Sequence, residues 1–256
     1  MTIFANLLGR TAIITGSSEG IGFAIAQRLG QHGANIVISS RKESNIEKAV
    51  STLKSQNIPV LGIKCLVSHA KHRSRLIEKT LEHFGKIDIL ISNVAINTHT
   101  GPVLECSEQN WDRIFETNVK AMWQLSREVY PHFKRNGGGN IVLVSSVAGY
   151  QPLGSLIGAY SVSKTTLFGL TKVLSQELAS DNIRVNCIAP GIVQTKFSKV
   201  LYDSPEAMKS ALDMIPLKRL AIPDDISGAV AFLVSDDAKY ITGETICITG
   251  GMATRL

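Results

Sequence analysis

Thr11-Ala-Ile-Ile-Thr-Gly-Ser-Ser-Glu-Gly-Ile-Gly22 is the stretch that decides the fold of this 256-residue chain. Its first five residues are uncharged and typical of a short buried strand, and a helical pattern of apolar residues begins at Ile21. Between them the glycines follow the spacing Gly-x-x-x-Gly-x-Gly, which also occurs in ordinary tight turns. Glycine lets backbone N–H groups approach a pyrophosphate, and the positive end of the helix dipole faces it. The stretch therefore predicts a phosphate cradle formed by Gly16, Ser18, Gly20, Ile21 and Gly22.

Short apolar runs alternate with helical patterns along the whole chain. The runs predict strands near 11–15, 34–40, 58–67, 87–92, 140–145, 183–188 and 245–248. The helical patterns cover about 20–31, 43–56, 69–84, 107–136, 158–179 and 223–235. Continuously hydrophobic strands separated by helices are typical of a parallel sheet covered on both faces. We therefore expect residues 1–256 to form a single-domain α/β Rossmann fold, with a doubly wound, seven-stranded parallel sheet and ligands at the carboxyl ends of its strands.

The composition argues against several classes of protein. Apolar residues make up 44% of the chain, and no apolar run reaches the roughly 20 residues that span a bilayer, so we expect a soluble protein with no membrane span. The net charge of +6 comes from scattered basic residues without interleaved aromatics, which argues against a nucleic-acid partner. The cysteines are also scattered, which predicts reduced thiols inside the cell and no metal site. They are Cys65, Cys106, Cys187 and Cys247.

The end of the second predicted strand bears on the choice of cofactor. In a dinucleotide-binding fold, an acidic residue at this position binds the ribose 2′-hydroxyl of NAD. Here the chain has Ser40, Arg41 and Lys42 instead. A guanidinium can hold a 2′-phosphate with two hydrogen bonds, so the sequence favours NADPH/NADP⁺. The alternative is that Arg41 and Lys42 only solvate a loop before the next helix.

Tyr160 and Lys164 are the candidate catalytic pair. Four residues apart on a helix, they lie on one face, one turn apart. A free tyrosine has a pKa of about 10, and a fixed ammonium nearby is expected to lower it towards neutral pH. Ser146, at the end of the fifth predicted strand, is placed to hydrogen-bond a substrate oxygen beside the tyrosine.

With these motifs in order, the chain resembles the short-chain dehydrogenase/reductase family from end to end. Thr15–Gly22 is similar to the family's cofactor motif, and Ser92-Asn-Val-Ala-Ile96 resembles its Asn-Asn-Ala-Gly segment. Asn118 stands where the family has a catalytic asparagine on a long helix. Pro190-Gly-Ile-Val-Gln-Thr195 resembles the segment that holds the nicotinamide carboxamide.

The resemblance implies roles for particular residues. Tyr160 protonates a carbonyl oxygen as hydride reaches the carbon, Ser146 stabilises the charge on that oxygen, and Lys164 binds the nicotinamide ribose. Asn118 holds a water that links Lys164 to solvent; without the resemblance, a buried asparagine at a helix kink is the simpler reading. The remaining cofactor contacts are expected from Asn93, Ala95, Pro190, Gly191, Val193 and Thr195.

Three positions depart from the family pattern. Val94-Ala95 replaces the usual Ala-Gly, which adds bulk near the cofactor. Leu66 stands where many members have an aspartate that binds adenine, so packing and backbone groups are expected to hold adenine here. Glu19 stands where many NADP-dependent members have a basic residue, which leaves phosphate selection to Ser40, Arg41 and Lys42.

Several segments resemble a group of peroxisomal carbonyl and retinal reductases within this family. The resemblance implies NADPH-dependent reduction of aromatic ketones, α-dicarbonyls and quinones, with retinal as a further candidate, in a homotetramer. The apolar segment near 192–217 predicts a mobile lid over an apolar substrate, with Phe197 on one wall and Leu153 on the other. Thr254-Arg255-Leu256 resembles a peroxisomal targeting tripeptide, and the cytoplasm is the alternative location.

Three other functions remain open. The same scaffold supports a 3-oxoacyl thioester reductase, or a sterol or secondary-alcohol dehydrogenase that uses NAD. The third alternative is a non-catalytic NADP-binding sensor. Arg41 argues against the NAD-dependent dehydrogenase, and the Ser146, Tyr160 and Lys164 set argues against the sensor.

Overall fold

The strand β1 (Thr11–Thr15) lies at the centre of the structure, and all five of its residues are buried. In this computed structural model, which describes residues 6–152 and 156–252, β1 belongs to a parallel sheet with the order β3-β2-β1-β4-β5-β6-β7. The predicted seven-stranded, doubly wound parallel sheet is therefore confirmed. The other strands are β2 (Asn35–Ser40), β3 (Val60–Lys64), β4 (Ile89–Ser92), β5 (Gly139–Val144), β6 (Ile183–Pro190) and β7 (Thr245–Ile248).

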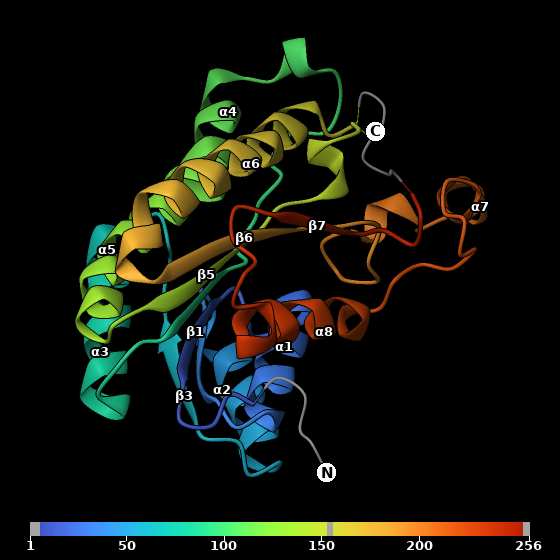
Figure 1. Cartoon of the computed structure of the whole chain (residues 1–256). Coiled ribbons are helices and arrows are strands. Elements are labelled where there is room, and N and C mark those ends of the chain that lie inside the picture. Colours follow the sequence, from blue (N-terminus) through green and yellow to red (C-terminus); the bar gives the residue numbers. More distant parts are fainter. Residues whose placement is uncertain (1–5, 153–155, 253–256) are drawn as a thin grey trace.

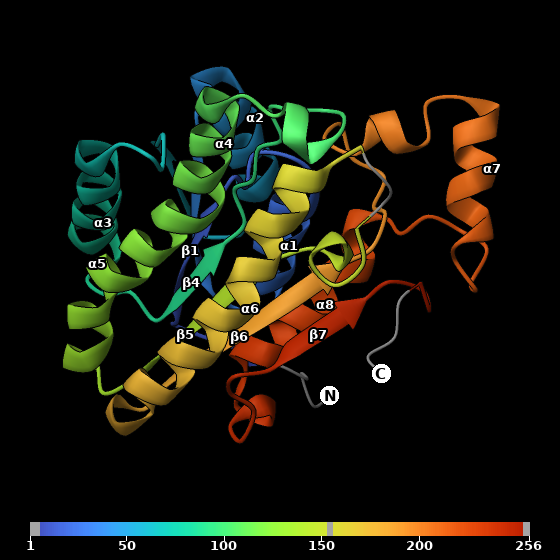
Figure 2. The same cartoon turned by 90° about the horizontal axis from the view of Figure 1, so that it is seen from above.

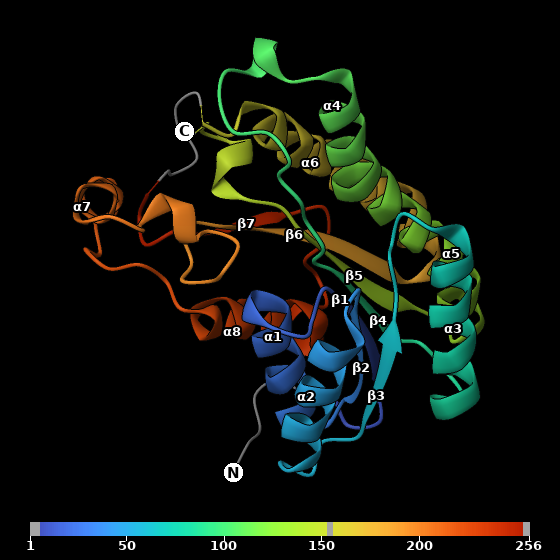
Figure 3. The ribbon, with the colours of Figure 1, turned by 180° about the vertical axis from the view of Figure 1, so that it is seen from behind.

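Helices cover both faces of the sheet (Figures 1 and 3). One face carries α1 (Gly20–Gln31), α2 (Glu43–Lys54) and α8 (Pro223–Val234). The other carries α3 (Ala70–Phe84), α5 (Ala121–Arg135) and α6 (Gly158–Leu178), with α4 (Glu108–Phe115) leading into α5. The view from above shows that α7 (Pro205–Asp213) stands apart from both layers, beyond the carboxyl ends of the strands (Figure 2).

Two hydrophobic cores follow from the alternation of side chains along each strand. In β1, Ala12 and Ile14 pack in the core beneath α1 and α8, whereas Ile13 packs in the core beneath α3 and α5. Burial of one such aliphatic side chain contributes about 1.5–3 kcal/mol to folding. Both faces of the central strands are apolar for this reason, and polar side chains concentrate where the strands end.

The strand order reverses between β1 and β4. The chain runs from β1 outward to β2 and β3, and then returns to place β4 on the other side of β1. The loops that follow β1 and β4 therefore leave the sheet in opposite directions and open a crevice at its carboxyl edge.

The helix expected at 107–136 is confirmed as a continuous helical run from Glu108 to Arg135. A π turn, η2 (Glu116–Lys120), separates α4 from α5 within this segment, so the backbone has one wider turn at Asn118. The expected lid segment also contains a helix, α7, which the sequence did not predict.

Two expectations fall outside the described residues. Leu153, as a substrate contact, and the targeting tripeptide Thr254-Arg255-Leu256 both stay predictions. Among the helices of residues 6–152 and 156–252, none is long and apolar enough to cross a membrane.

The packing around Gly22 can be tested by adding one methyl group. A Cβ there would lie 2.5 Å from the carbonyl oxygen of Gly16 and 2.6 Å from Nδ2 of Asn93, so a Gly22→Ala variant must shift the turn. We expect it to lower the free energy of unfolding by about 1–3 kcal/mol in urea titrations.

Gly228→Ala, in α8, is the matched control, because a Cβ there meets nothing within 4 Å. This helical site should gain about 0.5–1 kcal/mol from the same change. Equal free energies of unfolding for the two variants would contradict the close packing of Gly22 against Gly16 and Asn93.

Candidate active site

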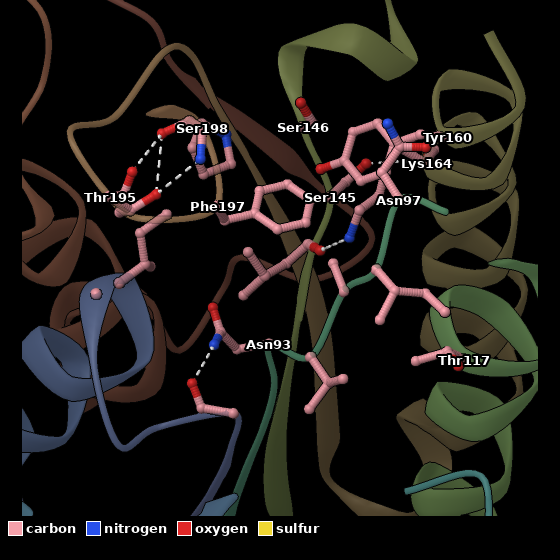
Figure 4. Close-up of a pocket in the computed structure, with 18 of the residues that line it drawn as sticks. Asn93, Asn97, Thr117, Ser145, Ser146, Tyr160, Lys164, Thr195, Phe197 and Ser198 are labelled. Carbon is pink, nitrogen blue, oxygen red and sulfur yellow. Dashed lines mark hydrogen bonds between the residues drawn. The ribbon is translucent and has the colours of Figure 1, made fainter. Parts of the chain in front are cut away.

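A cavity of about 1500 Å³ lies at the carboxyl edge of the sheet, in the crevice between β1 and β4. Figure 4 shows the side chains that converge on it from the ends of several strands and from α6. Most residues predicted for the site line this cavity. They are Gly16, Ser18, Gly20, Ile21, Ser40, Arg41, Leu66, Asn93, Ala95, Ser146, Tyr160, Lys164, Pro190, Gly191, Val193, Thr195 and Phe197.

The glycine turn has the geometry of an anion cradle. Gly16 and Gly20 have φ angles of 60° and 61°, which L side chains rarely adopt. The turn delivers the amino end of the 12-residue helix α1 to the cavity, where its backbone N–H groups and dipole favour negative charge. Gly22 lies behind the turn and permits its close packing. The residues present therefore fit the pyrophosphate of a dinucleotide.

Asn93 holds this turn in place. Its Nδ2 donates to the carbonyl oxygens of Thr15 (3.1 Å) and Gly16 (3.0 Å), and its backbone N–H donates to the Thr15 hydroxyl at 3.0 Å. The end of β4 is thereby fixed to the end of β1.

The adenosine end of the cavity is lined by Ser40 and Arg41 at the end of β2. Lys42 lies outside the cavity lining and stands at the N-cap of α2 instead. Glu19 turns its carboxylate towards Lys196, at 2.5 Å, so an exposed ion pair links the glycine turn to the segment after β6. Of Arg41 and Lys42, only Arg41 therefore lines the cavity.

Leu66 lies on the wall expected for adenine, between Cys65 and Val67. Its backbone N–H donates to Nδ1 of His72 at 3.2 Å, and the buried Arg73 donates to the Val67 carbonyl oxygen at 2.7 Å. Neighbouring side chains thus hold the backbone of this wall, which presents apolar surface to the cavity.

Tyr160 is buried at the cavity wall near Ser146, with 8% of its surface exposed. Burial raises the pKa of its phenol to about 12, and a hydrogen bond with the Ser146 hydroxyl offsets part of that rise. The expectation that Lys164 lowers this pKa is wrong in the structure. The Lys164 ammonium donates to the Val144 carbonyl oxygen at 2.8 Å and lies 5.6 Å from the centre of the tyrosine ring, so desolvation outweighs its attraction.

Lys164 is itself almost fully enclosed, with 1% of its surface exposed. Burial lowers the pKa of its ammonium to about 8. At neutral pH, Lys164 is therefore mostly a cation and Tyr160 is a neutral phenol. A neutral phenol at the cavity wall can donate a proton.

Asn118 lies behind the cavity wall in the π turn and is fully buried. Its Oδ1 accepts from the Ile96 backbone N–H at 2.8 Å, and its Nδ2 donates to the Ile96 carbonyl oxygen (2.9 Å) and the Ser163 hydroxyl (3.0 Å). The side chain joins the loop after β4 to α6. Its link to a water stays a prediction.

The segment after β6 divides into two parts. Phe197 faces Tyr160 across the cavity, with 5.8 Å between ring centres, and Val200 and Leu201 also line the cavity. Met208 and Leu212 in α7 pack instead on a small separate core. Only the first part of the expected lid therefore contacts the site.

Three serine and threonine side chains support the site and were missed by the sequence analysis. The Ser145 hydroxyl donates to the Lys164 carbonyl oxygen at 2.7 Å, and the Ser163 hydroxyl donates to the Tyr160 carbonyl oxygen at 2.6 Å. The third is Thr15, whose hydroxyl oxygen accepts a hydrogen bond from the Asn93 backbone N–H. All three stand inside motifs that the sequence analysis used, but spacing alone does not identify their partners.

The site thus combines a glycine turn that fits a dinucleotide with Tyr160, Lys164 and Ser146 in the lining of the same cavity. The family model described as enoyl-(acyl carrier protein) reductase matches residues 16–253. The chain belongs to the short-chain dehydrogenase/reductase family of oxidoreductases, as its motifs indicated.

Similar proteins of this family cover nearly the whole chain. It is 45% identical to human dehydrogenase/reductase SDR family member 4 over 250 residues, which is 98% of this chain and 90% of that protein. It is 49% identical to tropinone reductase-like 3 of Erythroxylum coca over 248 residues, or 97% and 95% of the two chains. The crystal structure of L-sorbose reductase from Gluconobacter frateurii, complexed with NADPH and L-sorbose, superimposes with a TM-score of 0.92, 32% identity and coverage of 99% and 100%.

The buried ammonium of Lys164 predicts a pH-dependent stability. The folded protein releases this proton near pH 8, whereas the unfolded chain keeps it up to the ordinary lysine pKa of 10.5. Between these values the unfolded state binds more protons, so this group makes the free energy of unfolding rise with pH. We expect the wild type to gain about 1–2 kcal/mol between about pH 7.5 and 9.5, relative to Lys164→Met, in urea titrations.

The methionine variant cancels the contributions of the other titrating groups in this comparison. Parallel pH curves for the two proteins would contradict a lowered pKa for Lys164.

Proposed function

We propose that the protein reduces carbonyl compounds to alcohols with NADPH. The observation that carries this proposal is the buried, protonated Tyr160, which lies near Ser146 on the wall of a cavity that also contains a dinucleotide cradle. Aromatic ketones, α-dicarbonyls and quinones are the proposed substrates, because apolar side chains line the substrate end. Among these side chains are Ile157, Phe197 and Val200. Retinal is a further candidate of the same apolar character.

The chain's own residues supply the proton and the electrostatic stabilisation. Tyr160 donates the phenolic proton to the carbonyl oxygen, and the Ser146 hydroxyl hydrogen-bonds the same oxygen as negative charge develops on it. Lys164 lies 5.6 Å from the centre of the tyrosine ring and would hold the nicotinamide ribose. The bound nicotinamide supplies the hydride.

Several residues fit NADPH. The glycine turn and the amino end of α1 would hold the pyrophosphate, and Arg41 with Ser40 would hold the 2′-phosphate. The segment from Pro190 to Thr195 lines the opposite side of the cavity and would hold the carboxamide. The similar L-sorbose reductase, crystallised with NADPH, supports this choice of cofactor.

A homotetramer is part of the proposal. Trp123 on α5 and Val162 and Val173 on α6 are between 40% and 51% exposed. Apolar side chains on two long helices would suit a symmetric helical interface.

Removal of the tyrosine hydroxyl tests the proposed proton transfer. We expect Tyr160→Phe to lower kcat with a diketone by about 10²–10⁴-fold, because the hydroxyl that donates the proton is lost. NADPH affinity, followed by cofactor fluorescence, should change little. A variant that keeps full turnover would overturn the proposal, and a wild type that binds NADPH without reducing any carbonyl would favour the sensor.

Removal of the Arg41 guanidinium tests cofactor selection. Arg41→Ala should raise the KM for NADPH about 10- to 100-fold, because a charge-assisted hydrogen bond contributes about 1.5–3 kcal/mol. The KM for NADH, which lacks the 2′-phosphate, should stay within about twofold. Lys48→Ala, on the exposed face of α2, is the matched control for a general loss of positive charge. Equal effects of Arg41→Ala on both cofactors would contradict the assignment.

A substrate panel separates the alternatives on the same scaffold. Initial rates with an aromatic diketone, retinal, an acetoacetyl thioester and a secondary alcohol, each with both cofactors, distinguish them. Preference for the thioester would favour the 3-oxoacyl reductase, and alcohol oxidation with NAD⁺ would favour the dehydrogenase.

A further inference from the structure

A buried ion pair lies behind the wall expected for adenine, and the proposed proton transfer does not use it. Arg73, in the first turn of α3, is buried, and its Nε donates to Oε1 of Glu128 on α5 at 2.9 Å. Its Nη1 donates in a different direction, to the Val67 carbonyl oxygen at 2.7 Å. Val67 lines the cavity next to Leu66. One guanidinium therefore connects α5 to the cavity wall.

This arginine stands where a helix least favours a cation. The first turn of α3 reads Ala70-Lys-His-Arg73, with two basic residues and no acid. The positive end of the helix dipole and the loss of hydrating water both disfavour a buried guanidinium at this place. Glu128 supplies the opposite charge from the neighbouring helix. Residues that break a local rule of helix stability in this way are expected at functional sites.

The contacts of the wall show what this guanidinium holds. The Val67 side chain packs in the core beneath α3 and α5, and the Val67 carbonyl oxygen accepts from Arg73, so both are fixed from behind. The Leu66 N–H donates to Nδ1 of His72, and the Leu66 carbonyl oxygen accepts from the His69 N–H at 2.9 Å. The backbone of this wall is thus tied to the beginning of α3, and the ion pair ties that beginning to α5.

An apolar wall makes the position of the backbone important for affinity. Leu66 offers adenine only dispersion contacts through its side chain. A gap of about 0.5–1 Å loses about a quarter to a half of the energy of such a contact. A small displacement of this wall would therefore weaken the binding of an adenine ring.

We propose that the Arg73–Glu128 ion pair positions the wall that binds the adenosine half of the cofactor. This inference rests on the proposed binding of NADPH and extends it to two residues outside the cavity lining. A planar guanidinium holds its acceptors in fixed directions, so the Glu128 carboxylate orients the Nη1 that binds the Val67 carbonyl oxygen. Arg73 and Glu128 are positioning residues, because they act on the cofactor through Leu66 and Val67.

Binding of the isolated adenosine half tests the inference without any turnover. Adenosine 2′,5′-bisphosphate contains the part of NADPH that would contact this wall. Arg73→Met keeps a long apolar side chain but removes both hydrogen bonds. We expect its Kd for the bisphosphate and for NADPH, measured by calorimetry, to rise about 3- to 30-fold, as is usual for coupling through packed side chains. The kcat at saturating NADPH should stay within about twofold, because the reacting end of the cavity is unchanged.

Three further variants separate positioning from a general loss of stability. Glu128→Gln keeps an oxygen that can accept from Nε, so both Kd values should stay within about twofold of the wild type. Arg73→Met/Glu128→Leu removes both charges together, so it avoids an unpaired buried charge and should show the same loss of affinity as Arg73→Met. Arg184→Met is the matched control and should leave both Kd values unchanged. Arg184 also donates to backbone carbonyl oxygens, those of Ser235 (2.9 Å) and Ile241 (3.1 Å), which lie outside the cavity lining.

The outcomes distinguish this inference from the proposed function. A wild type that binds neither NADPH nor the bisphosphate would overturn the proposed cofactor, and the positioning role with it. A wild type that binds both but reduces no carbonyl would overturn only the proposed reaction, and the calorimetry would still decide the positioning role. Unchanged affinity in the folded double variant, or an equal loss in Arg184→Met, would overturn the positioning role alone.

Discussion

The carboxamide of Asn93 joins the two halves of the molecule at the one point where the strand order reverses. Its two hydrogen bonds to Thr15 and Gly16 close the crevice floor between β1 and β4. Both strands contribute to the same cavity, β1 through the glycine turn that follows it and β4 through the loop that follows it. A shift between the strands would therefore move the cofactor side and the substrate side relative to each other. The hydrogen bonds of this amide oppose that shift together with the backbone pairing of β1 and β4.

The fold could be predicted from the sequence almost completely. The seven strands are short and continuously apolar because both sheet faces are covered, and this pattern is visible without any knowledge of contacts. The partners of Asn118 in the π turn could not be predicted, because its side-chain hydrogen bonds reach Ile96 and Ser163, which lie far from it in the sequence. Helix α7 was missed for a similar reason, since its apolar side chains pack on a local core that periodicity does not locate.

The candidate site could also be predicted only in part from the sequence. The residues that line the cavity were found because strand ends in a parallel sheet converge on one edge. The pKa values of these residues could not be predicted, because a pKa depends on how deeply the group is buried, and residue spacing does not determine burial. Helical spacing places Lys164 near Tyr160, but the Val144 carbonyl oxygen binds its ammonium and desolvation dominates both groups.

The reversal of strand order also has a consequence for the way the chain is made. On the ribosome, β1, β2 and β3 emerge in succession and can pair at once, but the other edge of β1 has to wait for β4. Until then, an apolar central strand presents free backbone N–H and C=O groups, which is the condition under which nascent chains associate wrongly. The most protected strand of the finished protein is thus the one most exposed to misassembly during synthesis.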